Sequence, residues 1–377
     1  MQHINGTDTP LARARVIAPR IEDLAKQIDE TRELPRDIVD AMVSAGLFRL
    51  LVPTSLGGEE IDILDYLDVV ETIAYADGSA GWCLNQGAVF ATTSGRAPRH
   101  LAEEVWGDPK TVVANGPPQG PKSLSVDQGF RLTGKWAFSS GCRHANWIAA
   151  VSGGSGQPPR LHLVTREEVD FIDVWDVQGL RGTGSFSFTA NDLFVPESRT
   201  MLLDVEPLEA GPLYVIPQHL LFACGFGCVA LGVARAGLDA TIELASDKRP
   251  RFDGKTLAHD AVVQNQIGKA EATWRAAKAL LYECMGTVWE SVKSTGSISV
   301  EERIHLRMAG THAIRQSADV VDIAYNLSGS SAIFSSTKIQ RRFQDAHVIT
   351  QQVQGRESHY QTVGEYFLGL DPTGPVF

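Results

Sequence analysis

The chain has 377 residues, and this length predicts two or three domains because single hydrophobic cores rarely grow so large. Hydrophobic residues make up 43% and charged residues 21%, the balance of an ordinary globular protein. The formal net charge of -11 disfavours a nucleic-acid partner or an anionic membrane surface, although a local arginine could still bind a phosphorylated small molecule.

Helical periodicity dominates residues 1–118. The stretch "IDILDYLDVVETIAYADGSAGWCLNQGAVFATTSG" predicts two helices that meet at Asp77-Gly78, the second capped by Asp77 or Ser79. The N-terminal stretch "MQHINGTDTPLARARV" lacks the apolar segment of a signal peptide, so we expect a cytoplasmic protein.

The pattern changes over residues 119–212, where Gly, Pro and alternating apolar residues are frequent. Stretches such as "FRLTGKWAF", "RLHLVT" and "SFSFTANDLFVP" each predict a strand, with turn residues between them. We expect an antiparallel β domain here.

Long periodic helices return over residues 213–377, with lengths that suit a four-helix bundle. Gly225, Gly227 and Gly232 faintly resemble a dinucleotide fingerprint, but they lie inside an apolar helix and follow no strand. We interpret them as helix-packing glycines. We find no run of about 18 apolar residues and predict no membrane span.

Signals for metal or disulfide chemistry are weak. Cys224 and Cys228 lie four residues apart in a predicted helix, which is not a zinc or redox spacing, so the five cysteines are predicted to be buried reduced thiols. Cys142 and His144 form too short a motif to indicate zinc, and we predict no metal.

Four stretches resemble the acyl-CoA dehydrogenase fold across nearly the whole chain: "ADGSAGWCLNQG" (76–87), "GKWAFSSGCRHANW" (134–147), "VQGLRGTGSFSFTANDLFVP" (177–196) and "LSGSSAIFSSTKIQRRFQDAHVITQQ" (327–352). The second and fourth are similar to the two-component flavin-dependent monooxygenases, which include aromatic hydroxylases and dibenzothiophene monooxygenases. The resemblance implies an α+β fold: an N-terminal helical domain (1–118), a middle antiparallel β-barrel (119–212) and a C-terminal four-helix bundle (213–377).

The dehydrogenase and monooxygenase branches need different chemistry. Many acyl-CoA dehydrogenases carry a Glu base after a Tyr-Glu-Gly-type turn, whereas the matching stretch here offers Asp345 and His347. Glu357 lies nearby in sequence, so an acyl-CoA dehydrogenase with FAD remains an alternative. A non-catalytic, flavin-free scaffold of the same fold is a second one.

The favoured resemblance implies a monooxygenase that forms a C4a-hydroperoxide from O2 and reduced FMN or FAD, and oxygenates a small aromatic or heteroatom-containing substrate. The adduct must be shielded from water and hydrogen-bonded to survive. A separate NAD(P)H:flavin reductase would supply the flavin, and a homotetramer is expected. The preferred flavin and the substrate stay open.

The resemblance also assigns cofactor contacts. Ser140 would lie near flavin N5, with Trp136 and Ser139 lining the same ring, although paired serines at a strand end between core indoles are the structural alternative. The remaining predicted flavin contacts lie in Gly-rich turns and a basic turn, each of which has a plain structural reading too: Gly182, Thr183, Ser185, Arg249, Arg251, Gly329 and Ser330.

Catalytic roles are assigned to Ser140, at flavin N5, and to His347 beside Asp345, for proton movement, with a satisfied structural histidine as the alternative. Relatives carry a second His five residues after the one that matches His347, and Gln352 stands there, which can hydrogen-bond but cannot titrate near neutral pH. The predicted substrate contacts are Trp82, Asn85, Gln86 and His144.

Overall fold

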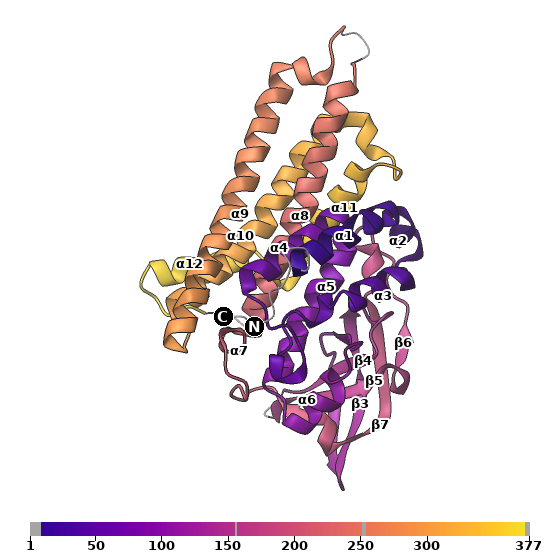
Figure 1. The fold of residues 1–377 in the computed structure, drawn as a ribbon, viewed down its shortest axis with the longest axis vertical. Helices are drawn as coiled ribbons and strands as arrows, with labels where there is room; N and C mark the ends of the chain where they lie inside the picture. The colour runs from indigo at the N-terminus through magenta and orange to yellow at the C-terminus, as the bar shows by residue number, and fades with distance from the viewer. Residues whose placement is uncertain (1–8, 155–156, 251–253, 374–377) are drawn as a thin grey trace.

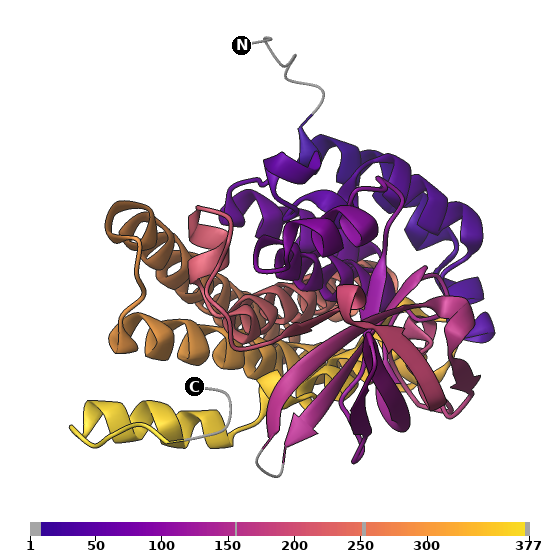
Figure 2. The same ribbon diagram turned by 90° about the horizontal axis from the view of Figure 1, so that it is seen from below.

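The computed structural model describes residues 9–154, 157–250 and 254–373. N-terminal helices, two small sheets and long C-terminal helices occupy three regions of the molecule (Figures 1 and 2). The order of helices, strands and helices confirms the predicted α+β fold with a middle sheet region.

The N-terminal region is helical, and side chains cap the first turns of three of its helices, α1, α4 and α5. Thr9 accepts from Ala12 N, and Asp62 accepts from Leu64 N. Asp77, and not Ser79, caps the helix predicted after it, because its Oδ1 accepts from Ala80 N at 3.0 Å. The helices are α1 (Pro10–Asp23), α2 (Ala25–Thr31), α3 (Arg36–Ser44), α4 (Ile63–Ala76), α5 (Gly78–Ala91) and α6 (Arg99–Trp106).

The strands form two separate sheets, so the expected closed barrel is wrong. One sheet has the order β1-β4-β5-β8 and the other β2-β3-β7-β6, and β1 pairs with β4 in parallel. The strands are β1 (Val113–Asn115), β2 (Lys122–Val126), β3 (Gly129–Ser139), β4 (Trp147–Gly154), β5 (Gln157–Thr165), β6 (Asp170–Ile172), β7 (Phe186–Pro196) and β8 (Thr200–Leu202). β1 lies before residue 119, so the first strand falls within the segment expected to form the N-terminal helical domain. The domain boundaries themselves stay a prediction.

A side-chain hydrogen bond links the two sheets. The Trp136 indole on β3 donates to Val151 O on β4 of the other sheet at 2.8 Å, and within its own sheet its ring stacks on Phe188 of β7 with centroids 4.9 Å apart. Burial of these aromatic rings is strongly favourable. It therefore stabilises the packing of the two sheets although no described strand of one sheet is hydrogen-bonded to a strand of the other in a ladder.

The C-terminal region is organised around α8, which contacts α4 and α5 as well as α9, α10 and α11 (Figure 1). Contrary to our expectation from the sequence, α8 is long and apolar enough to cross a membrane, but 89% of its most apolar window is buried inside the protein. It is the central core helix. The helices are α7 (Pro212–Val215), α8 (Gln218–Asp247), α9 (Ala261–Thr295), α10 (Val300–Ser328), α11 (Lys338–Thr350) and α12 (Ser358–Phe367).

The three glycines of α8 pack against neighbouring helices, as predicted. A Cβ on Gly225 would lie 1.9 Å from Asn85 Oδ1, and a Cβ on Gly232 would lie 2.6 Å from Glu71 O. A Cβ on Gly227 would meet Ala313 Cβ at 3.2 Å. The absence of side chains thus lets α8 approach α4, α5 and α10 closely.

We therefore expect Gly232→Ala to lower the free energy of unfolding by about 1–3 kcal/mol, because the new methyl group would overlap the backbone of α4. Gly268 in α9 is the matched control: a Cβ there meets nothing within 4 Å, so Gly268→Ala should raise stability by about 0.5–1 kcal/mol. Urea unfolding of both variants measures the two changes. Equal effects would show that close packing of α8 is not the reason for its glycine.

The five cysteines are free and buried, as expected. Burial raises the pKa of the Cys142 thiol to about 11, so this thiol is protonated at neutral pH.

Candidate functional site

A chain of hydrogen bonds joins α5, the end of β3 and the turn before β7. Trp82 Nε1 donates to Ser140 Oγ at 3.1 Å, and Ser140 Oγ lies 2.7 Å from Ser185 Oγ. Ser185 Oγ lies 2.7 Å from Thr183 Oγ1, which donates to Leu180 O at 2.8 Å. The structure thus connects residues that the sequence placed in separate roles, Trp82 with substrate and the hydroxyls with flavin.

The same turn is fixed to α11 by Asp345. Leu180 N donates to Asp345 Oδ1 at 2.6 Å, and Arg342 Nη1 lies 3.8 Å from Asp345 Oδ2. Burial, reinforced by the nearby Asp77 carboxylate, raises the pKa of Asp345 to about 7. A carboxyl group with such a pKa can hold or release a proton near neutral pH.

The Gly-rich turn itself is tightly packed. A Cβ on Gly182 would lie 2.1 Å from Ile28 Cγ2, so this glycine allows the turn to approach α2. Leu180 and Gly184 both have left-handed φ angles, of 50° and 49°. Gly182 and Thr183 are buried, and their contact with a flavin stays a prediction.

The aromatic strand presents a different ring from the one expected. Trp136 is fully buried between the sheets, and its predicted flavin contact remains untested. Phe138, which the sequence analysis did not select, is 63% exposed, with its ring centroid 6.2 Å from that of Trp175 in an edge-to-face arrangement. The period of a strand would put Trp136 and Phe138 on one face, but a register shift between Trp136 and Ser139 turns Phe138 outward.

Strain and unpaired polar atoms mark the end of β3. Phe138 has a φ of 53°, a left-handed conformation that costs energy for a bulky residue and is found at functional sites. Ser139 Oγ and His144 Nε2 are buried without a hydrogen-bond partner among the described residues. Burial lowers the pKa of His144 to about 4, so its imidazole is neutral at pH 7.

The predicted substrate contacts do not share one surface. Trp82 stacks on Phe226 with centroids 3.9 Å apart, on the helix face that also reaches Ser140. Asn85 is fully buried and accepts from Tyr66 Oη at 2.9 Å. Gln86 donates to Oδ1 of Asn115, the last residue of β1. Trp82 and His144 therefore lie beside the Ser140–Gly141 end of β3, whereas Asn85 points into the helical core.

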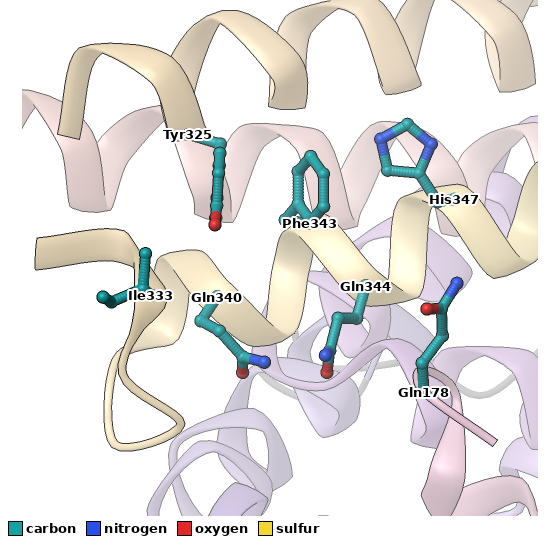
Figure 3. Close-up of a pocket in the computed structure, with 7 residues that line it drawn as sticks. All are labelled: Gln178, Tyr325, Ile333, Gln340, Phe343, Gln344 and His347. Carbon is teal, nitrogen blue, oxygen red and sulfur yellow. The ribbon is translucent and has the colours of Figure 1, made fainter. Parts of the chain in front are cut away.

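His347 lies apart from Ser140 and Asp345, the other two predicted catalytic residues. Its Nε2 is 2.8 Å from Asp322 Oδ1, and its ring contacts Phe343, which stacks on Tyr325 (Figure 3). Because residues two apart on a helix point in nearly opposite directions, α11 buries Asp345 and turns His347 away from it. His347 faces a cavity of about 350 Å3, whose other lining residues are Gln178, Tyr325, Ile333, Gln340, Phe343 and Gln344 (Figure 3).

The basic turn after α8 reaches the start of the 3-10 helix Gly329–Ile333 through Lys248. Lys248 Nζ donates to Ser328 O at 2.7 Å and to Ser331 Oγ at 3.0 Å. Arg249 donates to Gly254 O, and Arg251 lies outside the described residues. Ser330 is exposed beside Gly329, which has a positive φ of 54°.

Gln352, which replaces the second His expected from the resemblance, has a local structural role. Its Oε1 accepts from Gln354 N at 2.6 Å and caps the short 3-10 helix Val353–Gly355. The glutamine therefore holds the chain turn after α11.

Comparisons with known proteins identify the family to which this chain belongs. Family models described as "Acyl-CoA dehydrogenase, N-terminal domain" and "Acyl-CoA dehydrogenase, C-terminal domain" match residues 12–94 and 224–355. The chain belongs to the acyl-CoA dehydrogenase family. It is 33% identical to indole-3-acetate monooxygenase of Pseudomonas putida, over 92% of this chain and 90% of the relative. It is 29% identical to the flavin-dependent monooxygenase oxygenase subunit HsaA of Rhodococcus jostii, over 89% and 92% of the two chains.

Within that family, the chain is a member of the flavin-dependent monooxygenases, which are oxidoreductases. The crystal structure of 3-HSA hydroxylase from a Rhodococcus species superposes with a TM-score of 0.91 at 26% identity, covering 98% of this chain and all of that one. The resemblance seen in the sequence is thereby confirmed.

The alternative dehydrogenase base is badly placed for proton abstraction. The Glu357 side chain is 77% exposed, at the start of α12, and lies 3.8 Å from Arg315. A base that removes an unactivated proton works best when it is shielded from water.

Proposed function

We propose that the chain is the oxygenase component of a two-component monooxygenase. It takes reduced FMN or FAD from a separate NAD(P)H:flavin reductase and works as a cytoplasmic homotetramer. Reduced flavin supplies two electrons for the activation of O2; one oxygen atom enters the substrate and the other leaves as water. The names of the relatives, several of them monooxygenases of aromatic compounds, support this proposal.

One observation carries the assignment of the flavin site: the end of β3 combines an outward, strained Phe138 with the Ser140 hydroxyl two residues later. An exposed aromatic ring offers a stacking surface for a tricyclic flavin, and a nearby hydroxyl offers a hydrogen bond to its edge. Ser139 Oγ, which has no hydrogen-bond partner within the described part of the chain, adds a second polar group there. These residues fit a flavin: Phe138 and Trp175 would lie against its ring, and Ser140 would hydrogen-bond its N5.

Other side chains support proposed proton and substrate roles. Asp345, whose pKa is raised to about 7, holds a proton beside the turn whose Leu180 N donates to its carboxyl group. Neutral His144 and the Trp82 indole line the substrate side of Ser140. We propose a small aromatic substrate, for which indole-3-acetate is the first probe because of the Pseudomonas putida relative.

Single-turnover oxygenation tests this function. Protein is mixed anaerobically with reduced FMN or FAD and indole-3-acetate or p-hydroxyphenylacetate, and 18O2 is then admitted. Incorporation of one 18O atom into the product supports the proposal. Stoichiometric H2O2 with every aromatic probe contradicts it, and bleaching of bound FAD by an acyl-CoA would favour the dehydrogenase alternative.

Phe138→Ala is expected to weaken the binding of reduced flavin about tenfold, because a stacking contact of this kind contributes about 1–1.5 kcal/mol. The fold should keep its stability, since the ring is 63% exposed and its left-handed backbone is strained. Leu124→Ala on β2 removes a side chain of similar exposure and is the control. Anaerobic fluorescence titration measures both dissociation constants, and equal values would remove Phe138 from the flavin site.

A further inference from the structure

We propose that the chain of hydrogen bonds from Trp82 to Leu180 makes Ser140 a hydrogen-bond acceptor toward the flavin, so that the site selects the reduced cofactor. This inference rests on the proposed function, because it takes Ser140 as the neighbour of flavin N5. It assigns Trp82, Ser185 and Thr183 as positioning residues that act through Ser140.

The direction of every hydrogen bond in the chain follows from its two ends. At one end the Trp82 indole can only donate, and at the other the Leu180 carbonyl can only accept. Thr183 gives its single hydroxyl proton to Leu180 O, so the bond between Thr183 and Ser185 must use the Ser185 proton. The bond between Ser185 and Ser140 must then use the proton of Ser140.

Ser140 is therefore left with one free lone pair and no free proton. A hydroxyl oxygen accepts two hydrogen bonds, and the Trp82 indole occupies one of these positions. The hydroxyls of Ser140, Ser185 and Thr183 are all on buried residues, which deprives them of water as a substitute partner. Leu180 O also accepts from Trp175 Nε1 at 3.2 Å, and this second donor holds the accepting end in place.

Flavin N5 changes its hydrogen-bonding character with redox state. In the reduced ring N5 carries a hydrogen and donates, whereas in the oxidised ring N5 has only a lone pair and accepts. The free lone pair of Ser140 matches the reduced ring. To bind the oxidised ring, Ser140 would have to withdraw its proton from Ser185 and lose that hydrogen bond.

Ser185→Ala tests the proposal because it frees the Ser140 proton. The wild-type protein should bind reduced FMN more tightly than oxidised FMN, and the variant should reduce this ratio of dissociation constants about three- to tenfold. For a two-electron couple, the potential of the bound flavin should then become more negative by about 15–30 mV. Binding of oxidised FMN is measured by titration in air and binding of reduced FMN by titration without O2. The reduction potential of the bound flavin is measured by equilibration with a reference dye.

Two further variants make the result decisive. Thr183→Val removes the acceptor of the Ser185 proton, so Ser185 can donate to Ser140 and the ratio should also fall. Ser187→Ala, which alters a buried serine on β7 outside the chain, should leave the ratio unchanged.

The outcomes separate this inference from the function. If folded Ser185→Ala and Thr183→Val both bind FMN with the wild-type ratio, the inference is wrong and the function stands. If Ser185→Ala does not fold by circular dichroism, the Thr183→Val ratio alone decides in the same way. If wild-type protein binds neither FMN nor FAD in either redox state, the proposed function fails.

Discussion

Ser140→Ala is expected to uncouple O2 consumption from oxygenation, with the yield of oxygenated product per O2 falling about tenfold or more and H2O2 rising to match. The variant would lose the hydroxyl proposed to lie at N5. It would also leave the Trp82 indole without its acceptor and Ser185 without one of its two hydroxyl partners. An unsatisfied buried donor costs about 1–3 kcal/mol, so we also expect a lower melting temperature. Oxygen-electrode traces with parallel product and H2O2 assays measure the coupling.

Ser187→Ala is again the matched control, since it removes a buried hydroxyl from β7 without touching the Trp82–Leu180 chain. It should retain wild-type coupling. A Ser140→Ala protein that folds and keeps its full coupling would show that Ser140 does not assist oxygenation.

The second large effect concerns the dependence of stability on pH. Burial raises the pKa of Asp345 from 3.8 to about 7, so the folded protein holds a proton there that the unfolded chain releases at lower pH. Stability must therefore fall as pH rises from about 4 to about 7, by up to about 4 kcal/mol for this group, and level off above that.

Asp345→Asn should remove this contribution, because an amide keeps an oxygen for Leu180 N but has no proton to lose. Relative to the wild type, the variant should thus gain stability between pH 5 and pH 8. Urea unfolding of both proteins at the two pH values gives the difference directly, and titrating groups that do not interact with residue 345 cancel in the comparison. A difference between the proteins that is the same at pH 5 and pH 8 would contradict the raised pKa.

Most helices could be predicted from the sequence because their apolar periodicity is long and their caps are local. Asp77 shows this at α5, where a single side chain decides the helix start. The arrangement of the strands could not be predicted in the same way. Closure of a barrel depends on pairing between distant edges, and the Trp136 and Phe188 rings fill the space between two open sheets instead.

The sequence predicted several residues of the candidate site, but it did not predict how their side chains are arranged. Ser140, Thr183 and Ser185 were selected by resemblance, and the structure joins them in one chain. Phe138 was missed because the register shift in β3 is a tertiary effect that alternation alone conceals. Asn85 was selected for its polarity, but a polar side chain with a buried partner such as Tyr66 cannot be told from a pocket residue by sequence.

The position of α8 also bears on how the polypeptide is made. Its apolar face needs α4 and α5, which precede it, and α9, α10 and α11, which follow it. On the ribosome, this helix therefore emerges before α9, α10 and α11 have been synthesised. Until then, part of its apolar surface stays exposed and prone to aggregation. Chains truncated before α10 should consequently aggregate or require a chaperone, even though every residue of the Ser140 hydrogen-bond chain would already be present.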